Sequence, residues 1–184
     1  MKRKLRWGVA FLLIALLSRS AVAAPRRFEL EPTVGYAGTF TTGLSPYRAF
    51  VGLGVRANPA ARLWLSSSFS SYVGSGAAAD GPGVTYRARD RAYAAEFDAA
   101  WRFQFGRWLF EPGAALGVAW ILGATYVTPM RIRDRYLAAN LGPMLRLAVR
   151  VGTVAWGVEG TALYVPSYTA APIVRAGALV LLPF

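Results

Sequence analysis

Strict alternation of apolar and polar side chains is the feature that most restricts the fold of this sequence. It is clearest over 93–106, where the odd positions carry Tyr, Ala, Phe, Ala, Trp, Phe and Phe. The even positions of the same segment carry Ala, Glu, Asp, Ala, Arg, Gln and Gly. Successive side chains of a strand point to opposite faces, whereas a helix would mix the two sets. The segment therefore predicts a long β-strand with one wholly apolar face.

Seven further segments share this period of two, which gives eight predicted strands in all. Short links alternate with longer ones, so neighbouring strands should pair as hairpins in an antiparallel meander. Strands of roughly 10 to 14 residues exceed the usual soluble strand of about 5 to 6 and match a tilted membrane-crossing strand of about 9 to 11 residues with extensions. We expect an all-β fold, an eight-stranded antiparallel up-and-down transmembrane β-barrel. The predicted strands cover 28–40, 47–57, 62–73, 93–106, 110–122, 137–150, 154–164 and 174–184.

Residues 1–23 have the three parts of a secretory signal peptide. A basic start is followed by the apolar run 7–17, and Ala21-Val22-Ala23 supplies the small residues that signal peptidase accepts. The run is shorter than the roughly 20 residues that a membrane-spanning helix needs. We expect cleavage after Ala23, which leaves 24–184 as one outer-membrane barrel domain. The formal charge of +12 includes the basic residues of this segment, so the mature chain is less basic than the whole.

Alternation alone does not say which face lies inside. The polar face is built mainly of Gly, Ala, Ser and Thr with a few acids and arginines, whereas a soluble surface carries Lys and many more charges. Small residues with a few opposite charges suit a narrow, filled lumen, where an unpaired charge is costly. We therefore place the apolar face against lipid and expect an ion-pair network inside the barrel. Its predicted members are Glu29, Glu31, Arg48, Arg56, Glu96, Asp98, Arg102, Glu111, Asn140, Arg146, Glu159 and Arg175.

The residue types that are missing exclude several kinds of chemistry. Without His there is no Ser-His or Cys-His nucleophile, and without Cys there is neither a disulfide nor a thiolate metal site. No metal-ligand cluster or glycine-rich phosphate loop is recognisable, so we expect no metal, no cofactor and no catalytic residues. An outer-membrane enzyme that depends on histidine is excluded, and we do not expect the chain to be an enzyme.

Aromatic residues gather near both ends of the predicted strands, as in the two interfacial girdles of membrane barrels. Tyrosines, including Tyr47, lie toward the ends with long loops, whereas most Trp and Phe lie toward the short turns. The chain ends in Phe184 on an apolar strand face. With the signal peptide and the strands, these features resemble the small eight-stranded outer-membrane barrels of Gram-negative bacteria, the class that contains the OmpA transmembrane domain, OmpX and OmpW. The resemblance implies that Phe184 helps the barrel assembly machinery to recognise the last strand, and that rearrangement of a lumenal charge network can open a pore.

Two of the longer loops, 74–91 and 123–135, carry arginine at every second position, which indicates strand extensions with one charged face. Guanidinium groups suit phosphate, so we expect these residues to contact lipopolysaccharide in the outer leaflet. An ordinary solvated or ion-paired loop surface is the alternative. An exported chain has little access to nucleic acid, so we do not expect it as a partner, and we expect a monomer. The arginines are Arg87, Arg89, Arg91, Arg131, Arg133 and Arg135.

The sequence thus predicts a structural or surface-interaction role in the outer membrane, with a side-chain-filled lumen and arginine-rich extracellular loops. A narrow gated channel or a lateral transporter of small molecules is the first alternative, since eight strands leave room only for side chains or one small ligand. A soluble periplasmic β-barrel that binds an apolar ligand in its core is the second. Pro143 falls in the middle of a predicted strand, where a bulge would accommodate it.

Overall fold

Strands form nearly all of the computed structural model, which describes residues 28–39, 45–165 and 172–184. The signal peptide predicted for 1–23 lies outside these ranges. Within them, no helix is long and apolar enough to cross a membrane. The strands are β1 Phe28–Thr39, β2 Ala49–Ala60, β3 Leu63–Val73, β4 Gly76–Gly81, β5 Val84–Trp101, β6 Phe103–Phe105, β7 Trp108–Val127, β8 Met130–Val151, β9 Val154–Leu163 and β10 Ile173–Pro183.

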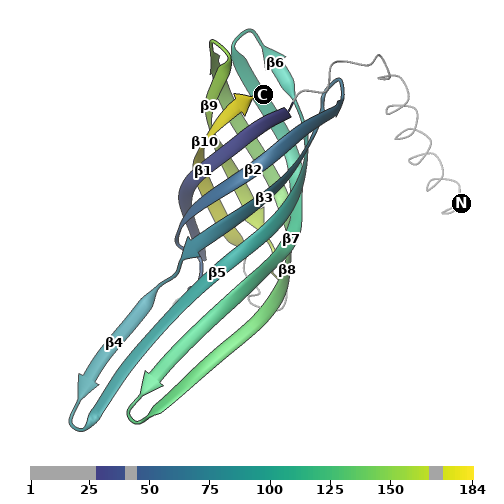
Figure 1. Cartoon of the computed structure of the whole chain (residues 1–184). Coiled ribbons are helices and arrows are strands. Elements are labelled where there is room, and N and C mark those ends of the chain that lie inside the picture. Colours follow the sequence, from purple (N-terminus) through teal and green to yellow (C-terminus); the bar gives the residue numbers. More distant parts are fainter. Residues whose placement is uncertain (1–27, 40–44, 166–171) are drawn as a thin grey trace, which may run out of the picture.

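These strands form a closed antiparallel barrel with eight positions around its circumference (Figure 1). β4 continues the course of β3, and β6 continues that of β5, so ten strands occupy eight positions. β3 and β4 both pair with β5, β5 and β6 both pair with β7, the other strands pair with their neighbours in the chain, and β1 closes the barrel by pairing with β10. The predicted eight-stranded up-and-down fold is confirmed.

The two ends of the barrel differ. Tight turns at 61–62, 106–107 and 152–153 lie at the end that also holds the C-terminus, here called the short-turn end. Gly106 and Gly152 have φ of 60° and 64° there, which glycine adopts without strain. At the other end β4, β5, β7 and β8 run far beyond the barrel as two long hairpins (Figure 1). The β7–β8 ladder is unbroken from Trp108–Val149 to Val127–Met130, about 65 Å at 3.4 Å per residue.

The inside and outside of the barrel reverse the pattern of a soluble protein. Large apolar side chains face outward, as Leu141 does with 60% of its surface exposed, whereas Arg56 and Arg146 are buried. Charged groups are almost never buried without partners, and apolar exteriors of this extent require an apolar surrounding. The apolar face therefore lies outside, and the alternative of a soluble barrel with an apolar ligand-binding core does not fit.

Three of the five prolines within the described strands follow one rule. In an antiparallel sheet, the N–H and C=O of a residue point to the same neighbouring strand, so proline weakens the ladder on one side only. Pro143 keeps its pairing with Ala114 of β7, whereas the β8–β9 ladder skips 142–143 and resumes in the same register. The bulge considered for Pro143 is therefore absent. In the same way, Pro32 interrupts the β1–β10 ladder. Pro112 interrupts the pairing of β7 with β5 and β6.

Candidate functional site

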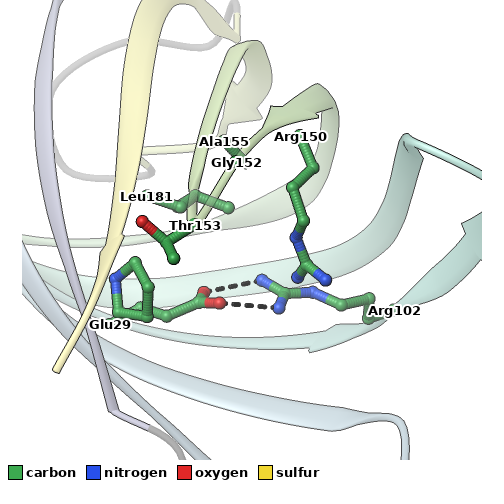
Figure 2. Close-up of a pocket in the computed structure, with 8 residues that line it drawn as sticks. Glu29, Arg102, Arg150, Gly152, Thr153, Ala155 and Leu181 are labelled. Carbon is green, nitrogen blue, oxygen red and sulfur yellow. Dashed lines mark hydrogen bonds and ion pairs between the residues drawn. The ribbon is translucent and has the colours of Figure 1, made fainter.

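The lumen at the short-turn end holds a layer of two arginines and two glutamates. Arg102 donates two hydrogen bonds to the Glu29 carboxylate, at 2.8 and 2.7 Å (Figure 2), and a third to Glu111. Arg56 bridges the same two carboxylates, at 3.4 Å from Glu29 and 2.5 Å from Glu111. The Trp64 ring lies 3.8 Å from the Arg102 guanidinium and 5.1 Å from that of Arg56, so it covers both cations.

Arg146 organises the middle layer. Its guanidinium lies 2.9 Å from Glu31, 2.8 Å from Asp98 and 3.1 Å from Glu159, and these four residues come from four different strands. The Arg56 Nε lies 3.2 Å from Glu31 and so joins this layer to the one below. Charge-assisted contacts of this kind are the strong ones when water is excluded.

A third layer surrounds Arg175 toward the long-hairpin end. Arg175 lies 2.5 Å from Glu96 and 3.4 Å from Glu159, and it donates a hydrogen bond of 3.1 Å to the Tyr72 hydroxyl. The Asn140 amide donates to the other oxygen of Glu96 at 3.1 Å. The three layers therefore form one connected network, because Glu159 contacts both Arg146 and Arg175.

Aromatic and aliphatic side chains fill the lumen beside this last layer. The rings of Tyr47 and Phe50 pack on Tyr72, with centroids 5.1 and 5.3 Å away. Gly35 pairs with both Phe50 and Gly177, and the absence of side chains at the two glycines leaves room for the Phe50 ring. The side chains of the three layers and these rings therefore lie in the lumen, and a cavity of about 260 Å³ lies at the short-turn rim beside Arg102 and Arg150 (Figure 2).

The structure places eleven of the twelve predicted network residues inside the lumen, and Arg48 is the exception. Arg48 is exposed because the chain over 45–48 is not part of β2, so the alternation that starts at Ala49 does not extend back to it. The same break turns Tyr47 into the lumen rather than into the outer aromatic girdle. Glu31 and Arg146 belong to the middle layer.

Sequence reasoning missed the aromatic and hydroxyl partners of the network. Trp64 and Ser66 occupy even positions of β3, the inward parity of that strand, and Ser66 donates a hydrogen bond of 2.8 Å to Asp98. Position parity was the signal that would have placed Trp64 inside.

The two predicted arginine loops are strand extensions. β4 and the distal parts of β5, β7 and β8 form a four-stranded sheet beyond the barrel, here called the hairpin sheet. Residues paired across strands share a face, and the register places all six arginines on the same side of this sheet. The rows are Arg87–Tyr126–Arg131, Arg89–Ala124–Arg133 and Arg91–Leu122–Arg135. We call this side the arginine face.

Acidic residues of the hairpin sheet are mostly on its other side. Asp90 and Asp134 both pair with Gly123 and face one another across it. Partial burial and the negative charge of Asp134 raise the pKa of Asp90 above its usual value. Asp80 is on the arginine face and binds Arg87 at 2.9 and 3.0 Å, and this hydrogen bond lowers the pKa of Asp80.

Comparison with known proteins identifies the architecture. The sequence matches no protein-family model and no curated protein sequence. The structure is similar to a major outer-membrane protein of Thermus thermophilus, with a TM-score of 0.65, 12% identity and coverage of 88% of this chain and 100% of that one. It is also similar to the N-terminal barrel domain of Pseudomonas aeruginosa OprF, with a TM-score of 0.52, 15% identity and coverage of 86% and 97%.

The chain has the fold of the small eight-stranded outer-membrane β-barrels. A third similar structure is Ail of Yersinia pestis, solved with the heparin analogue sucrose octasulfate, with a TM-score of 0.54, 7% identity and coverage of 86% and 96%. These identities are low, so the likeness concerns the fold. The family resemblance drawn from the alternating segments and Phe184 is confirmed at that level.

Proposed function

We propose that this chain is an exported outer-membrane protein whose closed barrel anchors the hairpin sheet at the cell surface for contact with other molecules. The apolar exterior and the fold support the membrane location. The observation that carries the proposal is the filled lumen, in which four arginines and six carboxylates are buried and joined across strands. On this proposal the barrel neither conducts ions at rest nor catalyses a reaction.

The arrangement of the carboxylates supports a structural role rather than a catalytic one. Glu29 and Glu111 contact two arginines each, and Asp98 contacts Arg146 and the Ser66 hydroxyl. A general acid or base must reach a proton of the substrate, whereas these carboxylates are occupied by cations in a lumen filled by side chains. The sequence has no histidine that would take the role instead.

A conductance measurement in planar lipid bilayers tests the closed lumen. We expect the purified, folded protein to give no unitary conductance, and the double variant R102M/R146M to conduct, because its charged layers lose two of four cations. Steady unitary currents from the unaltered protein would contradict the closed lumen and favour the narrow gated channel.

Cell fractionation tests the proposed location. The protein should remain in the sarkosyl-insoluble membrane fraction, and its gel mobility should change on boiling. Recovery in the soluble periplasmic fraction would contradict the proposal. A lateral transporter needs an opening between strands, whereas hydrogen-bonded ladders join every neighbouring pair of barrel strands in the described part of the chain.

A further inference from the structure

The position of the arginine face relative to the barrel is its most informative property. On β5, β7 and β8 the same face continues toward the short-turn end as the row Tyr93–Trp120–Leu137 and then as the row Ala95–Val118–Ala139. These residues belong to the apolar exterior. Measured along the strands at 3.4 Å per residue, the arginine rows start about 7 Å beyond the Tyr93 row and end about 20 Å beyond it. The headgroup region extends roughly 5–8 Å beyond the hydrocarbon core on each side of a bilayer, so the first arginine row lies at about that depth and the other two rows lie farther out.

Most of the positive charge on this face has no ion-pair partner among the described residues. Arg87 binds Asp80, whereas the other five arginines make no ion pair with any described residue. Asp90 and Asp134, which lie at the same height, face the other side of the sheet. The register thus separates the charges, with arginines toward the outside of the barrel and two acids toward its axis.

The spacing of the arginines suits several phosphate groups at once. The arginines of β5 and β8 flank β7, so the two columns stand about 10 Å apart, and rows within a column are about 7 Å apart. Leu122 and Ala124 lie between the columns and carry no charge. A depression of about 410 Å³ adjoins Arg87 and Arg89, and Gly76, Ala78 and Ala124 line it. Guanidinium groups bind phosphate through paired N–H donors, and separate groups on one lipid can be held from both columns.

We propose that the arginine face binds the phosphate groups of a lipid anchored in the outer leaflet, a phosphorylated glycolipid of the lipopolysaccharide type. The lipid lies beside the barrel, with its acyl chains against the apolar row below and its phosphates between the arginine columns. The arginines point sideways over the outer leaflet rather than toward the tip of the hairpins. This orientation favours a lipid over a soluble polyanion. This inference deepens the surface-contact role proposed above and rests on the outer-membrane location.

Binding is measured on the full-length protein by native mass spectrometry in detergent, with bisphosphorylated lipid A and its dephosphorylated form as probes. The sextuple variant with serine at all six arginines tests the face as a whole. R89S/R133S removes one row, and R62S/R107S is its matched control, because these exposed arginines lie at the short-turn end. The exchange I132R/R133I keeps composition and net charge and moves one arginine to the other side of the sheet. Heat-modifiable gel mobility verifies folding of each variant.

We expect the unaltered protein to prefer the bisphosphorylated lipid about tenfold, the equivalent of one charge-assisted contact. The sextuple variant should lose this preference, R89S/R133S and I132R/R133I should reduce it, and R62S/R107S should leave it unchanged. Equal binding by the sextuple variant, or full binding by I132R/R133I, would overturn the proposal. Binding of heparin without binding of lipid A would show a soluble sulfated partner instead and would also overturn it. The closed barrel is assessed separately by conductance, so failure here leaves that result intact.

Discussion

Replacement of Arg146 by methionine tests whether the lumenal network stabilises the barrel. Methionine keeps an unbranched side chain and removes the charge. Of the three carboxylates that Arg146 contacts, Glu31 keeps Arg56 at 3.2 Å and Glu159 keeps Arg175 at 3.4 Å. Asp98 keeps only the Ser66 hydroxyl at 2.8 Å. The variant thus leaves one buried carboxylate without a cation, and removal of one partner of a buried pair costs about 3–5 kcal/mol.

The free energy of unfolding is measured by urea titration in phospholipid vesicles, with tryptophan fluorescence and gel mobility as two probes. R146M should lose about 3–5 kcal/mol. The second substitution D98N removes the orphaned charge, so R146M/D98N should recover most of the loss, and the coupling energy of the double-mutant cycle should reach about 2–3 kcal/mol. R150M at the half-buried rim is the matched control and should change stability by less than about 1 kcal/mol. A loss below about 0.5 kcal/mol in R146M, or no recovery with D98N, would refute the reasoning.

Three further predictions concern other parts of the molecule. G35A should lower the free energy of unfolding by about 2 kcal/mol or more, because the added methyl group would overlap the Ala176 carbonyl and press on Phe50, whereas the nearest atom to a methyl group at Gly160 is 4.0 Å away and G160A should be neutral. F184S should reduce the heat-modifiable fraction of the protein in cells, because the last strand loses its terminal aromatic ring, whose centroid lies 6.0 Å from that of Phe28. F105S, which replaces an exposed Phe at the same end of the barrel, should leave this fraction unchanged. The raised pKa of Asp90 means that its ionised form destabilises the hairpin sheet, so amide protection in this sheet should fall as pH rises through the pKa of Asp90. The substitution D134N should weaken this pH dependence. Hydrogen exchange corrected for intrinsic rates measures both effects.

Position parity allowed much of the barrel to be predicted from the sequence. A side chain two residues along a strand returns to the same face, so Glu96, Asp98 and Ala100 could be placed together inside, and Phe97 outside, before any pairing was known. The arginines at 87, 89 and 91 follow the same rule. Parity fails where a strand ends, which is why Arg48 and Tyr47 were placed on the wrong faces.

The partners within the lumen were beyond prediction. Arg146 contacts residues of β1, β5 and β9, and which of these strands meet at one height depends on the tilt and stagger of the barrel. A single sequence carries no direct signal of that stagger. For the same reason, the outward direction of the arginine face emerged only from the register of β5, β7 and β8.

Because the sequence has no native cysteine, the arrangement of lipid outside the barrel and buried polar groups inside it can be measured residue by residue. Single cysteines introduced in turn at 137–148 of β8 can carry a spin label in bilayers, and collision with oxygen and with a water-soluble nickel complex reports its surroundings. We predict a period of two, with high oxygen contact at odd positions such as Leu141 and Leu145, and low contact with both reagents at even positions such as Asn140. Nickel contact at the odd positions, or no alternation, would contradict the central claim.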